Sequence, residues 1–228
     1  MERKIIITGD SSNSISIPEL NVTYHSVHGA IPESKHIFIE KGLLYQINQS
    51  TTKQINIFEM GFGTGLNALL TLIESEKLNR KIYYETIELF PLENSQIKLL
   101  NYCELLRRND LQKTFEQLHH CDWEKEIKIS ETFYLSKTKQ TLQNYKTSAP
   151  KNIIYFDAFD PNAQPELWTK EIFTKMFSIL EPGGTLVTYS SKGIVRRAMQ
   201  SAGFIVEKLP GPPGKREMVR CRTAINRI

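Results

Sequence analysis

The stretch "IFEMGFGTGLNALLTL", residues 57–72, has the three parts of a ligand-binding turn. A continuous apolar run predicts a buried strand, and a leucine-rich segment with helical spacing follows it. Between them, three glycines at alternate positions permit positive φ and the close approach of a ligand. The first turn of the helix adds free backbone N–H groups at the same place. We therefore expect a cofactor at this turn.

From residue 55 onward, apolar strands alternate with amphipathic helices, which is typical of a parallel sheet with crossover helices. The expected fold class is α/β, with a Rossmann-like, doubly wound and mostly parallel sheet. The last two strands should form an antiparallel hairpin at one edge. We expect strands at residues 55–60, 81–89, 128–136, 152–159, 185–191, 204–209 and 216–225, and helices at 65–78, 91–108, 109–123, 165–180 and 192–203.

Residues 1–50 have a different pattern. Short apolar runs at residues 4–10, 14–19 and 36–46 are separated by turn residues, as in strands joined by hairpins. No linker rich in proline, glycine or serine follows them. We therefore expect residues 1–50 to form a β extension packed on a domain of residues 51–228.

The composition is that of a globular protein with one sizeable core: 228 residues, of which 40% are hydrophobic and 24% charged. No apolar run reaches the length of a membrane span, and the N-terminus lacks the apolar core of a secretion signal. The cysteines Cys103, Cys121 and Cys221 are too widely spaced to predict a disulfide frame or a metal site. We expect a cytoplasmic protein without a membrane partner.

Positive charge is concentrated near the C-terminus. Only Glu207 and Glu217 oppose the cations of that region, although the net charge of the whole chain is only +4. A basic face suits a polyanionic partner, while an arginine-rich solvated surface is the alternative. The cations are Lys192, Arg196, Arg197, Lys208, Lys215, Arg216, Arg220, Arg222 and Arg227.

The order of residues at the glycine turn separates two classes of cofactor. A nicotinamide dinucleotide site requires G-x-G-x-x-G, and neither Gly61 nor Gly63 begins that pattern. The spacing acid-x-Gly-x-Gly-x-Gly, typical of methyltransferases, is complete. S-adenosylmethionine is therefore the expected cofactor. The expected binding residues at the turn are Glu59, Gly61, Phe62, Gly63, Thr64, Gly65 and Asn67.

The second strand agrees with this assignment. It ends in "ETIELFPL", which places Glu88 at the strand tip, where a carboxylate can accept hydrogen bonds from both ribose hydroxyls. An ordinary solvated acid is the alternative for Glu88. The turn "LEPGGTLV", residues 180–187, also recurs in this class of fold.

Several further motifs, taken in order, resemble one family. They are similar to the methyltransferase half of the bifunctional tRNA 5-methylaminomethyl-2-thiouridine biosynthesis protein, and the resemblance covers nearly the whole chain. The motifs are "HGAIPESKHIFIEKGL" (28–43), "FEMGFGTGLNALL" (58–70), "ELFPL" (88–92), "YFDAFDPNAQPELWT" (155–169), "LEPGGTLVTYSSKGIVRRAMQSAGF" (180–204) and "GPPGKREM" (211–218).

The resemblance implies methyl transfer from S-adenosylmethionine to the amine of 5-aminomethyl-2-thiouridine at the wobble position. The expected partner is then tRNA, bound through its anticodon stem-loop. The family's flavin-dependent half has no room in 228 residues, so a separate flavin-dependent oxidoreductase or another enzyme is expected to make the amine. Methyltransferases commonly place an acid near adenine after the third strand. Here that stretch reads "SKTKQTLQNY", so Ser136 or Thr141 would form the hydrogen bond.

The implied reaction requires a neutral amine, whereas an alkyl amine with a pKa of about 10 is mostly protonated at neutral pH. Asp157 ends the strand at 152–159, where a carboxylate can contact the cofactor side, hydrogen-bond the amine and accept its proton. Phe159 is expected to stack on the unstacked base. Asp157 and Phe159 are therefore the expected catalytic residues.

Two loops contribute the remaining candidates. Trp168 is expected either to wall the substrate pocket or to be a core residue, and Asp160 is favoured as a turn cap over a catalytic acid. In "GPPGKREM", Lys215 and Arg216 suit phosphate contacts, with Glu217 holding Arg216 in place. A plain hairpin turn is the alternative.

His119, His120 and Cys121 are adjacent, but the neighbouring sequence supplies no further ligand, so no metal is expected. Two other functions stay open. One is a small-molecule amine methyltransferase or an aminopropyltransferase-like enzyme, which would share the glycine turn and the strand-tip acids. The other is a non-catalytic module that binds a nucleoside or RNA.

Overall fold

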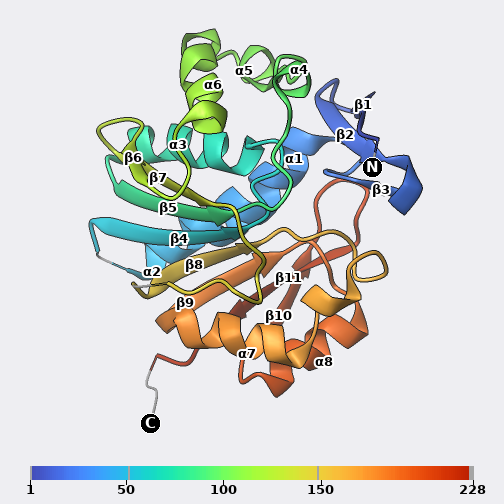
Figure 1. Ribbon diagram of the computed structural model, residues 1–228. Helices are drawn as coiled ribbons and strands as arrows, with labels where there is room; N and C mark the ends of the chain where they lie inside the picture. The colour runs from blue at the N-terminus through green and yellow to red at the C-terminus, as the bar shows by residue number, and fades with distance from the viewer. Residues whose placement is uncertain (1, 51, 148, 226–228) are drawn as a thin grey trace.

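The computed structural model describes residues 2–50, 52–147 and 149–225, and their centre is an eight-stranded sheet of order β10-β11-β9-β8-β4-β5-β7-β6 (Figure 1). The five central strands are parallel, which confirms the α/β class and the mostly parallel sheet. They are β4 (Gln54–Met60), β5 (Lys81–Ile87), β7 (Phe133–Thr138), β8 (Lys151–Phe156) and β9 (Leu180–Thr188). Antiparallel strands β6 (Glu126–Lys128), β10 (Ile205–Pro210) and β11 (Glu217–Arg222) complete the edges.

Each face of the sheet is buried under its own layer of helices. Because side chains alternate along a strand, Ile57 and Tyr155 pack on one face, whereas Phe58 and Phe156 pack on the other. Helices α3 (Leu66–Leu78) and α6 (Gln112–His120) cover the first face, and α7 (Lys170–Ile179) and α8 (Gly193–Ser201) cover the second. Burial on both faces explains the unbroken apolar runs of the central strands.

Four expected elements differ in detail. The helix expected at 91–108 is two short helices, α4 (Asn94–Ile97) and α5 (Tyr102–Leu105), and Arg107 follows with a φ of 56° that a continuing helix does not allow. The strand expected at 128–136 is the β6–β7 hairpin. The helix expected at 165–180 is a 3-10 turn η4 (Pro165–Leu167) followed by α7, and η3 (Asn109–Leu111) precedes α6.

The N-terminal fifty residues contain both a small sheet and a long helical segment. Strands β1 (Lys4–Ile7), β2 (Asn13–Ile17) and β3 (Val22–Thr23), with the turn η1 (Pro18–Leu20), form a three-stranded antiparallel sheet. The strand expected at 36–46 is wrong. That stretch is helical, in the continuous run α1 (Ala30–Ser34), η2 (Lys35–Leu44) and α2 (Tyr45–Gln49).

Tertiary packing explains this difference. A short apolar run fits a strand or a buried helix equally well. Here Phe38 and Leu43 are buried against the central sheet, and Gly42 lies so close to it that an added Cβ would be 3.0 Å from Val187. The helical segment therefore shares the core of the sheet, and residue 50 does not separate two cores.

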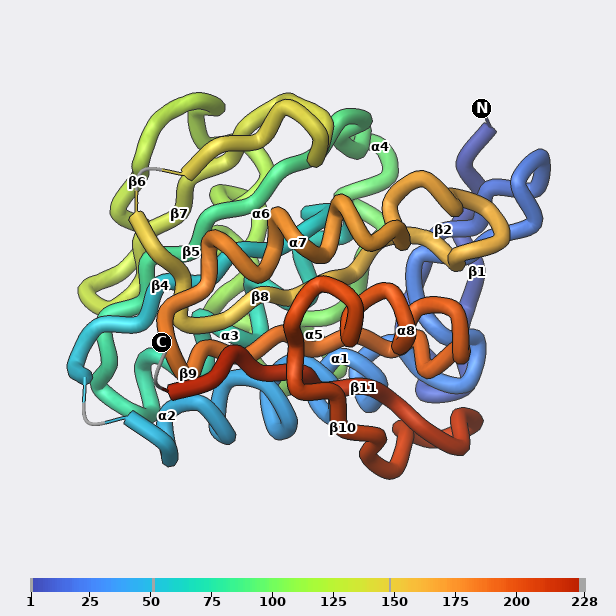
Figure 2. Tube along the Cα trace, turned by 90° about the horizontal axis from the view of Figure 1, so that it is seen from below, coloured from blue at the N-terminus to red at the C-terminus, as the bar shows by residue number. Residues whose placement is uncertain are grey.

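Figure 2 shows the N-terminal segment beside the turn of the β10–β11 hairpin, where Lys215 contacts Glu33 across 182 positions of sequence. This contact joins the N-terminal helical segment to the turn of the last hairpin. Arg227, counted above among the C-terminal cations, lies outside the described residues. None of the helices within the described ranges combines the length and the apolar character needed to cross a membrane.

Candidate active site

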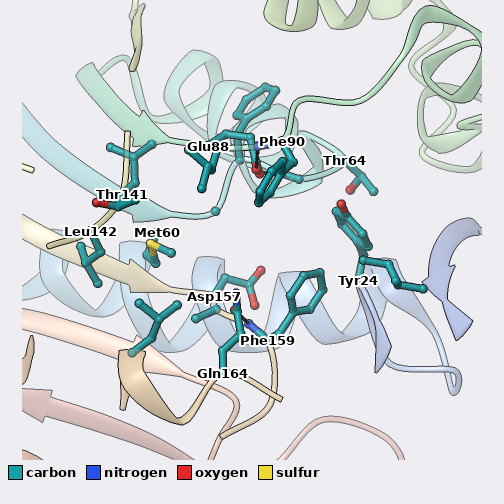
Figure 3. Close-up of a pocket in the computed structure, with 18 of the residues that line it drawn as sticks. Tyr24, Met60, Thr64, Glu88, Phe90, Thr141, Leu142, Asp157, Phe159 and Gln164 are labelled. Carbon is teal, nitrogen blue, oxygen red and sulfur yellow. Dashed lines mark hydrogen bonds between the residues drawn. The ribbon is translucent and has the colours of Figure 1, made fainter. Parts of the chain in front are cut away.

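A cavity of about 590 Å³ opens at the carboxyl ends of β4, β5 and β8 (Figure 3). This is the end of a doubly wound sheet where ligands bind. Its lining comes from the glycine turn, the β5 tip, the segments 140–143 and 157–167, and the N-terminal small sheet. Asp157 lies in the middle of this lining, with Met60 and Leu142 on one side and Tyr24 and Phe159 on the other.

The glycine turn is shaped by backbone hydrogen bonds and positive φ. Gly61, Gly63 and Gly65 have φ values of 89°, 50° and 72°, and Gly61 N–H donates to Ile87 O at 3.1 Å. An added Cβ on Gly63 would lie 3.1 Å from the Tyr24 ring. Gly61 and Gly63 line the cavity, whereas Gly65 packs against His119 behind it. At Gly61 and Gly63, the turn therefore presents only backbone atoms to the cavity.

Glu88 follows β5 at the cavity wall opposite Asp157. Its Oε2 accepts a hydrogen bond from Gly63 N–H at 3.0 Å, and its Oε1 accepts one from Phe90 N–H at 2.8 Å. Each carboxylate oxygen has a second acceptor site. The carboxylate is thus held in place by backbone and can still accept two ribose hydroxyls.

Asn67, in the first turn of α3, joins two carboxyl groups. Its Nδ2 donates to Glu59 Oε1 at 3.1 Å and to Asp157 Oδ2 at 2.9 Å. Strand alternation places both acids on the α3 side of the sheet. Glu59 is 1% exposed and is not among the residues that line the cavity, so its place supports Asn67. The cofactor contact expected for Glu59 stays a prediction.

The two acids have unusual protonation behaviour. Burial raises the pKa of Asp157 to about 7, and the negative charge of Glu33 adds to the shift. The Asn67 hydrogen bond and the positive charge of Lys215 act in the opposite direction on that pKa. Burial also raises the pKa of Glu59 well above its usual range, and the charge of Asp157 acts in the same direction. Asp157 is therefore a carboxyl group in the cavity lining whose pKa lies near neutral pH.

The N-terminal small sheet supplies a wall that the sequence analysis missed. The Tyr24 ring meets Phe159 edge to face, with centroids 5.2 Å apart. Burial raises the pKa of Tyr24 to about 12, so its hydroxyl stays neutral. Arg3 lines the same wall and donates to Phe90 O at 2.6 Å. Only the aromatic character of Tyr24 offered a signal in the sequence, because this contact spans more than a hundred residues.

His25 links the small sheet to the glycine turn and was also missed. Its Nδ1 lies 3.0 Å from Ser14 Oγ, and its Nε2 lies 3.3 Å from Thr64 Oγ1. Burial lowers the pKa of His25 to about 4, so the ring is neutral. A neutral imidazole bridges two hydroxyls here, which fixes Thr64 at the cavity wall.

The loop after β8 places Phe159 in the cavity and Trp168 beneath it. Trp168 is 4% exposed, packs in the core and does not line the cavity, so its expected role as a pocket wall is wrong. Its Nε1 donates to Phe159 O at 2.9 Å, which fixes the loop from below. Asp160 Oδ1 accepts from Asn162 N–H at 2.8 Å, the turn-cap geometry that was expected. Gln164 Oε1 accepts from Phe159 N–H and lines the cavity.

The "GPPGKREM" loop is arranged differently from the expectation. Lys215 Nζ points inward, 2.6 Å from Glu33 Oε1 and 4.1 Å from the centroid of the Tyr189 ring. Glu217 accepts from Lys208 at 2.8 Å, whereas the sequence analysis paired it with Arg216. Of the two cations proposed for phosphate contacts, only Arg216 is exposed.

His119 and His120 have different partners in the structure, and only one of the two candidates for the adenine contact lies at the cavity. His119 Nε2 lies 3.1 Å from Thr64 O behind the glycine turn, whereas His120 Nε2 lies 2.7 Å from Asn94 Oδ1. Thr141 lines the cavity, but Ser136 lies on the sheet away from it. Thr141 is thus the better placed of the two adenine candidates.

These features suit an adenosyl cofactor. The turn presents backbone where an added Cβ would intrude, Glu88 is placed for ribose, and the buried Asn67 Oδ1 has no hydrogen-bond partner within the described chain. The cavity then continues past Asp157 into a second half lined by Tyr24 and Phe159. A donor and an acceptor would meet at Asp157.

Comparison with known proteins agrees with this geometry. A family model described as S-adenosyl-L-methionine-dependent methyltransferase matches residues 105–224, just over half of the chain. The tRNA 5-methylaminomethyl-2-thiouridine biosynthesis bifunctional protein MnmC of Cupriavidus metallidurans is 29% identical over 91% of this chain. The protein of the same name from Leptospira interrogans is 30% identical over 86% of it. The alignments cover 32% of each relative, so the chain spans about a third of their length.

Solved structures confirm the fold. MNMC2 from Aquifex aeolicus superposes with a TM-score of 0.75 at 21% identity, covering 100% of this chain and 72% of that one. Spermidine synthase from Thermotoga maritima superposes with a TM-score of 0.57 at 10% identity, covering 98% and 69%. The glycine turn, the fold and the family model agree, and the chain belongs to the S-adenosyl-L-methionine-dependent methyltransferase family.

Proposed function

We propose that this protein transfers a methyl group from S-adenosylmethionine to the primary amine of 5-aminomethyl-2-thiouridine at the wobble position of tRNA, giving 5-methylaminomethyl-2-thiouridine. The observation that supports it best is the place of Asp157. It stands between the glycine turn and an aromatic-walled half of the cavity, with a pKa near 7. The relatives are named for the biosynthesis of this nucleoside.

Asp157 matches the chemical need of an amine acceptor. The substrate arrives mainly as an ammonium ion, and the Asp157 carboxylate accepts one of its protons. S-adenosylmethionine held by the glycine turn and Glu88 would supply the methyl group to the freed nitrogen lone pair and would leave as the neutral thioether, which keeps the electron pair of the S–C bond. Asn67 keeps Asp157 Oδ2 directed at this point.

The second half of the cavity suits a base taken out of its stack. Phe159 is held from two sides, since its ring meets Tyr24 in an edge-to-face pair and its carbonyl accepts from Trp168 Nε1. Stacking on such rings is the usual platform for an unstacked RNA base. Gln164 adds amide hydrogen-bonding capacity at the same wall.

A basic strip adjoins this half. Lys192 Nζ donates at 2.6 Å to Asp160 Oδ1, and Asp160 follows Phe159 of the cavity lining in the chain. The hydrogen bond from Lys208 lowers the pKa of Glu217, and the charges of Arg216 and Arg196 act in the same direction. Arg197 and Arg216 are exposed. We define the basic strip as Lys192, Arg196, Arg197 and Arg216. Phosphate contacts are proposed for these residues, and Lys215 is excluded because it points inward.

The proposed reaction needs a supplier of the aminomethyl group. The relatives are about three times as long as this chain, and an enzyme that produces the amine, flavin-dependent or not, is the partner activity we propose. The place of action would be the cytoplasm, with tRNA as the macromolecular substrate.

A panel of acceptors tests the proposal. Purified protein and methyl-labelled S-adenosylmethionine are incubated with an anticodon stem-loop carrying the aminomethyl wobble uridine, with the unmodified stem-loop, and with putrescine. We expect label only in the aminomethyl stem-loop. Label in putrescine would favour a small-amine enzyme, and tight cofactor binding with no label anywhere would favour a binding module; either outcome overturns the proposal.

A further inference from the structure

Lys215 occupies an unusual place for a lysine in a surface turn. Its Nζ forms an ion pair with Glu33 of α1 and lies over the Tyr189 ring. The Glu33 side chain is 8% exposed, and its other oxygen accepts from Ser26 N–H at 2.6 Å. The Lys215 side chain is 31% exposed, so the pair joins the β10–β11 turn to the N-terminal segment at a half-buried place, where a charge interaction is screened less than between two fully exposed groups.

Tyr189 extends this contact to the catalytic strand. Its hydroxyl donates to Ala158 O at 2.8 Å, and Ala158 is the neighbour of Asp157. The residues Glu33, Lys215 and Tyr189 do not line the cavity. Any effect that they have on methyl transfer must pass through Asp157 or through the backbone beside it.

We propose that Glu33 and Lys215 are positioning residues, whose ion pair holds Tyr189 against the strand end and sets the local charge at the Asp157 carboxyl. The inference rests on the proposed role of Asp157 as proton acceptor. It assigns a role to Lys215 of "GPPGKREM", whose inward direction does not suit phosphate binding. The pair lies outside the cavity and acts on Asp157 in two ways. It acts through its charges, and it acts through Tyr189, which donates to the carbonyl of the neighbouring Ala158.

The groups that face Asp157 come from every element around it. Glu33 comes from α1, Lys215 from the β10–β11 turn, Asn67 from α3, Glu59 from β4, Tyr84 from β5 and Tyr189 from the end of β9. Among them only Lys215 is a cation. Burial raises the pKa values of Tyr84 and Tyr189 above their ordinary value, so these tyrosines stay neutral near pH 7, and it raises the pKa of Glu59 well above its usual range. The charges that shift the pKa of Asp157 are those of Glu33 and Lys215, which are opposite in sign.

This arrangement predicts shifts of opposite sign. Lys215→Met removes the positive charge and leaves Glu33, so the pKa of Asp157 should rise. Glu33→Gln removes the negative charge and leaves Lys215, so that pKa should fall. We expect roughly 0.5–1 unit in each direction, less than the 1–3 units of a charge in direct contact. The double variant should return close to the wild-type value.

The test is an NMR titration of the Asp157 carboxyl carbon in the full chain labelled with ¹³C-aspartate, the signal being assigned with Asp157→Asn. Lys215→Arg keeps the charge and should restore the wild-type midpoint. Lys208→Met, on the same hairpin but paired with Glu217, is the matched control and should leave the midpoint unchanged. Melting temperatures show whether each variant is folded, and Glu33→Gln keeps the test decisive if Lys215→Met does not fold.

Opposite shifts that cancel in the double variant support the inference. Shifts in the same direction in both single variants, or none, would overturn it, because a purely structural pair loosens the site in either case. The NMR readout needs no methyl transfer. Opposite shifts in an enzyme inactive on the aminomethyl stem-loop would therefore refute the proposed function and leave the electrostatic assignment intact.

Discussion

The two halves of the cavity are built by different means. The cofactor half is formed mainly by backbone groups. Gly61 N–H, at the end of β4, donates to Ile87 O at the end of the neighbouring strand β5, and Gly63 N–H donates to the Glu88 carboxylate. The acceptor half rests on side chains from distant segments, with Tyr24 meeting Phe159 edge to face. A backbone-built wall tolerates changes in neighbouring side chains, whereas a wall of packed rings depends on each of them. Substitutions should therefore separate the binding of the two substrates.

The largest effect is expected at the junction of the two halves. Asp157→Asn keeps the shape and a hydrogen-bonding group but cannot accept a proton, so turnover should fall by about 10²-fold or more. The dissociation constant for S-adenosylmethionine should change little. Single-turnover methyl transfer and calorimetry measure the two quantities, with the exposed Asp122→Asn as control. Turnover within a few-fold of wild type would remove Asp157 from the mechanism.

A substitution in the cofactor half should act on cofactor affinity. Glu88→Gln removes the charge from an acceptor of two ribose hydroxyls, and charge-assisted hydrogen bonds are worth about 1.5–3 kcal/mol. The dissociation constant for S-adenosylmethionine should rise roughly 10- to 100-fold. Glu93→Gln, also at the cavity, is the matched control. Equal effects of both substitutions in calorimetry would contradict the ribose assignment.

A substitution in the acceptor half should act on RNA. Tyr24→Leu removes the ring that supports Phe159, and the KM for the aminomethyl stem-loop should rise about 5- to 10-fold, within the range of one base–aromatic contact. Cofactor affinity should stay near the wild-type value, although Tyr24 also touches Gly63. If cofactor affinity fell as much as RNA affinity, the division into two halves would be wrong.

The smallest effect concerns stability. The folded-state pKa of Asp157, about 7, lies above the ordinary 3.8, so between these values the folded chain binds more protons than the unfolded chain. Stability contributed by this group is therefore lost as pH rises through that window. Asp157→Asn avoids the loss, and its melting temperature should exceed that of wild type at about pH 8 by ~2–4 °C for each kcal/mol of loss avoided, and by less at about pH 5. Calorimetric scans at both pH values measure this difference, and an equal difference at both would contradict the raised pKa.

The fold and the cofactor half were predictable because their signals are local. The glycine turn, Glu88 and Asp157 each follow directly on a strand whose apolar run is unmistakable. The helix at residues 35–44 was not predictable in the same way, since its apolar spacing fits either structure and packing against Val187 decides.

The acceptor half depends on contacts between distant segments, and a single sequence does not contain them. Tyr24 and His25 lie in a segment without a recognisable motif, so their approach to the glycine turn had no local signal. Lys215 and Arg216 are adjacent basic residues in one turn, yet one points inward to Glu33 and the other to solvent. Trp168 fits a pocket wall or a core residue, and its position below the loop resolves the choice.

The central claim is that Asp157 accepts the proton of the substrate ammonium. The pH dependence of single-turnover methyl transfer to the aminomethyl stem-loop, at saturating S-adenosylmethionine, tests it most directly. We predict that the wild-type rate rises with pH through a limb near 7, the pKa of Asp157, and that this limb is absent in Asp157→Asn. The same limb in the variant, or a wild-type limb only near ~10, the pKa of the free amine, would contradict the account.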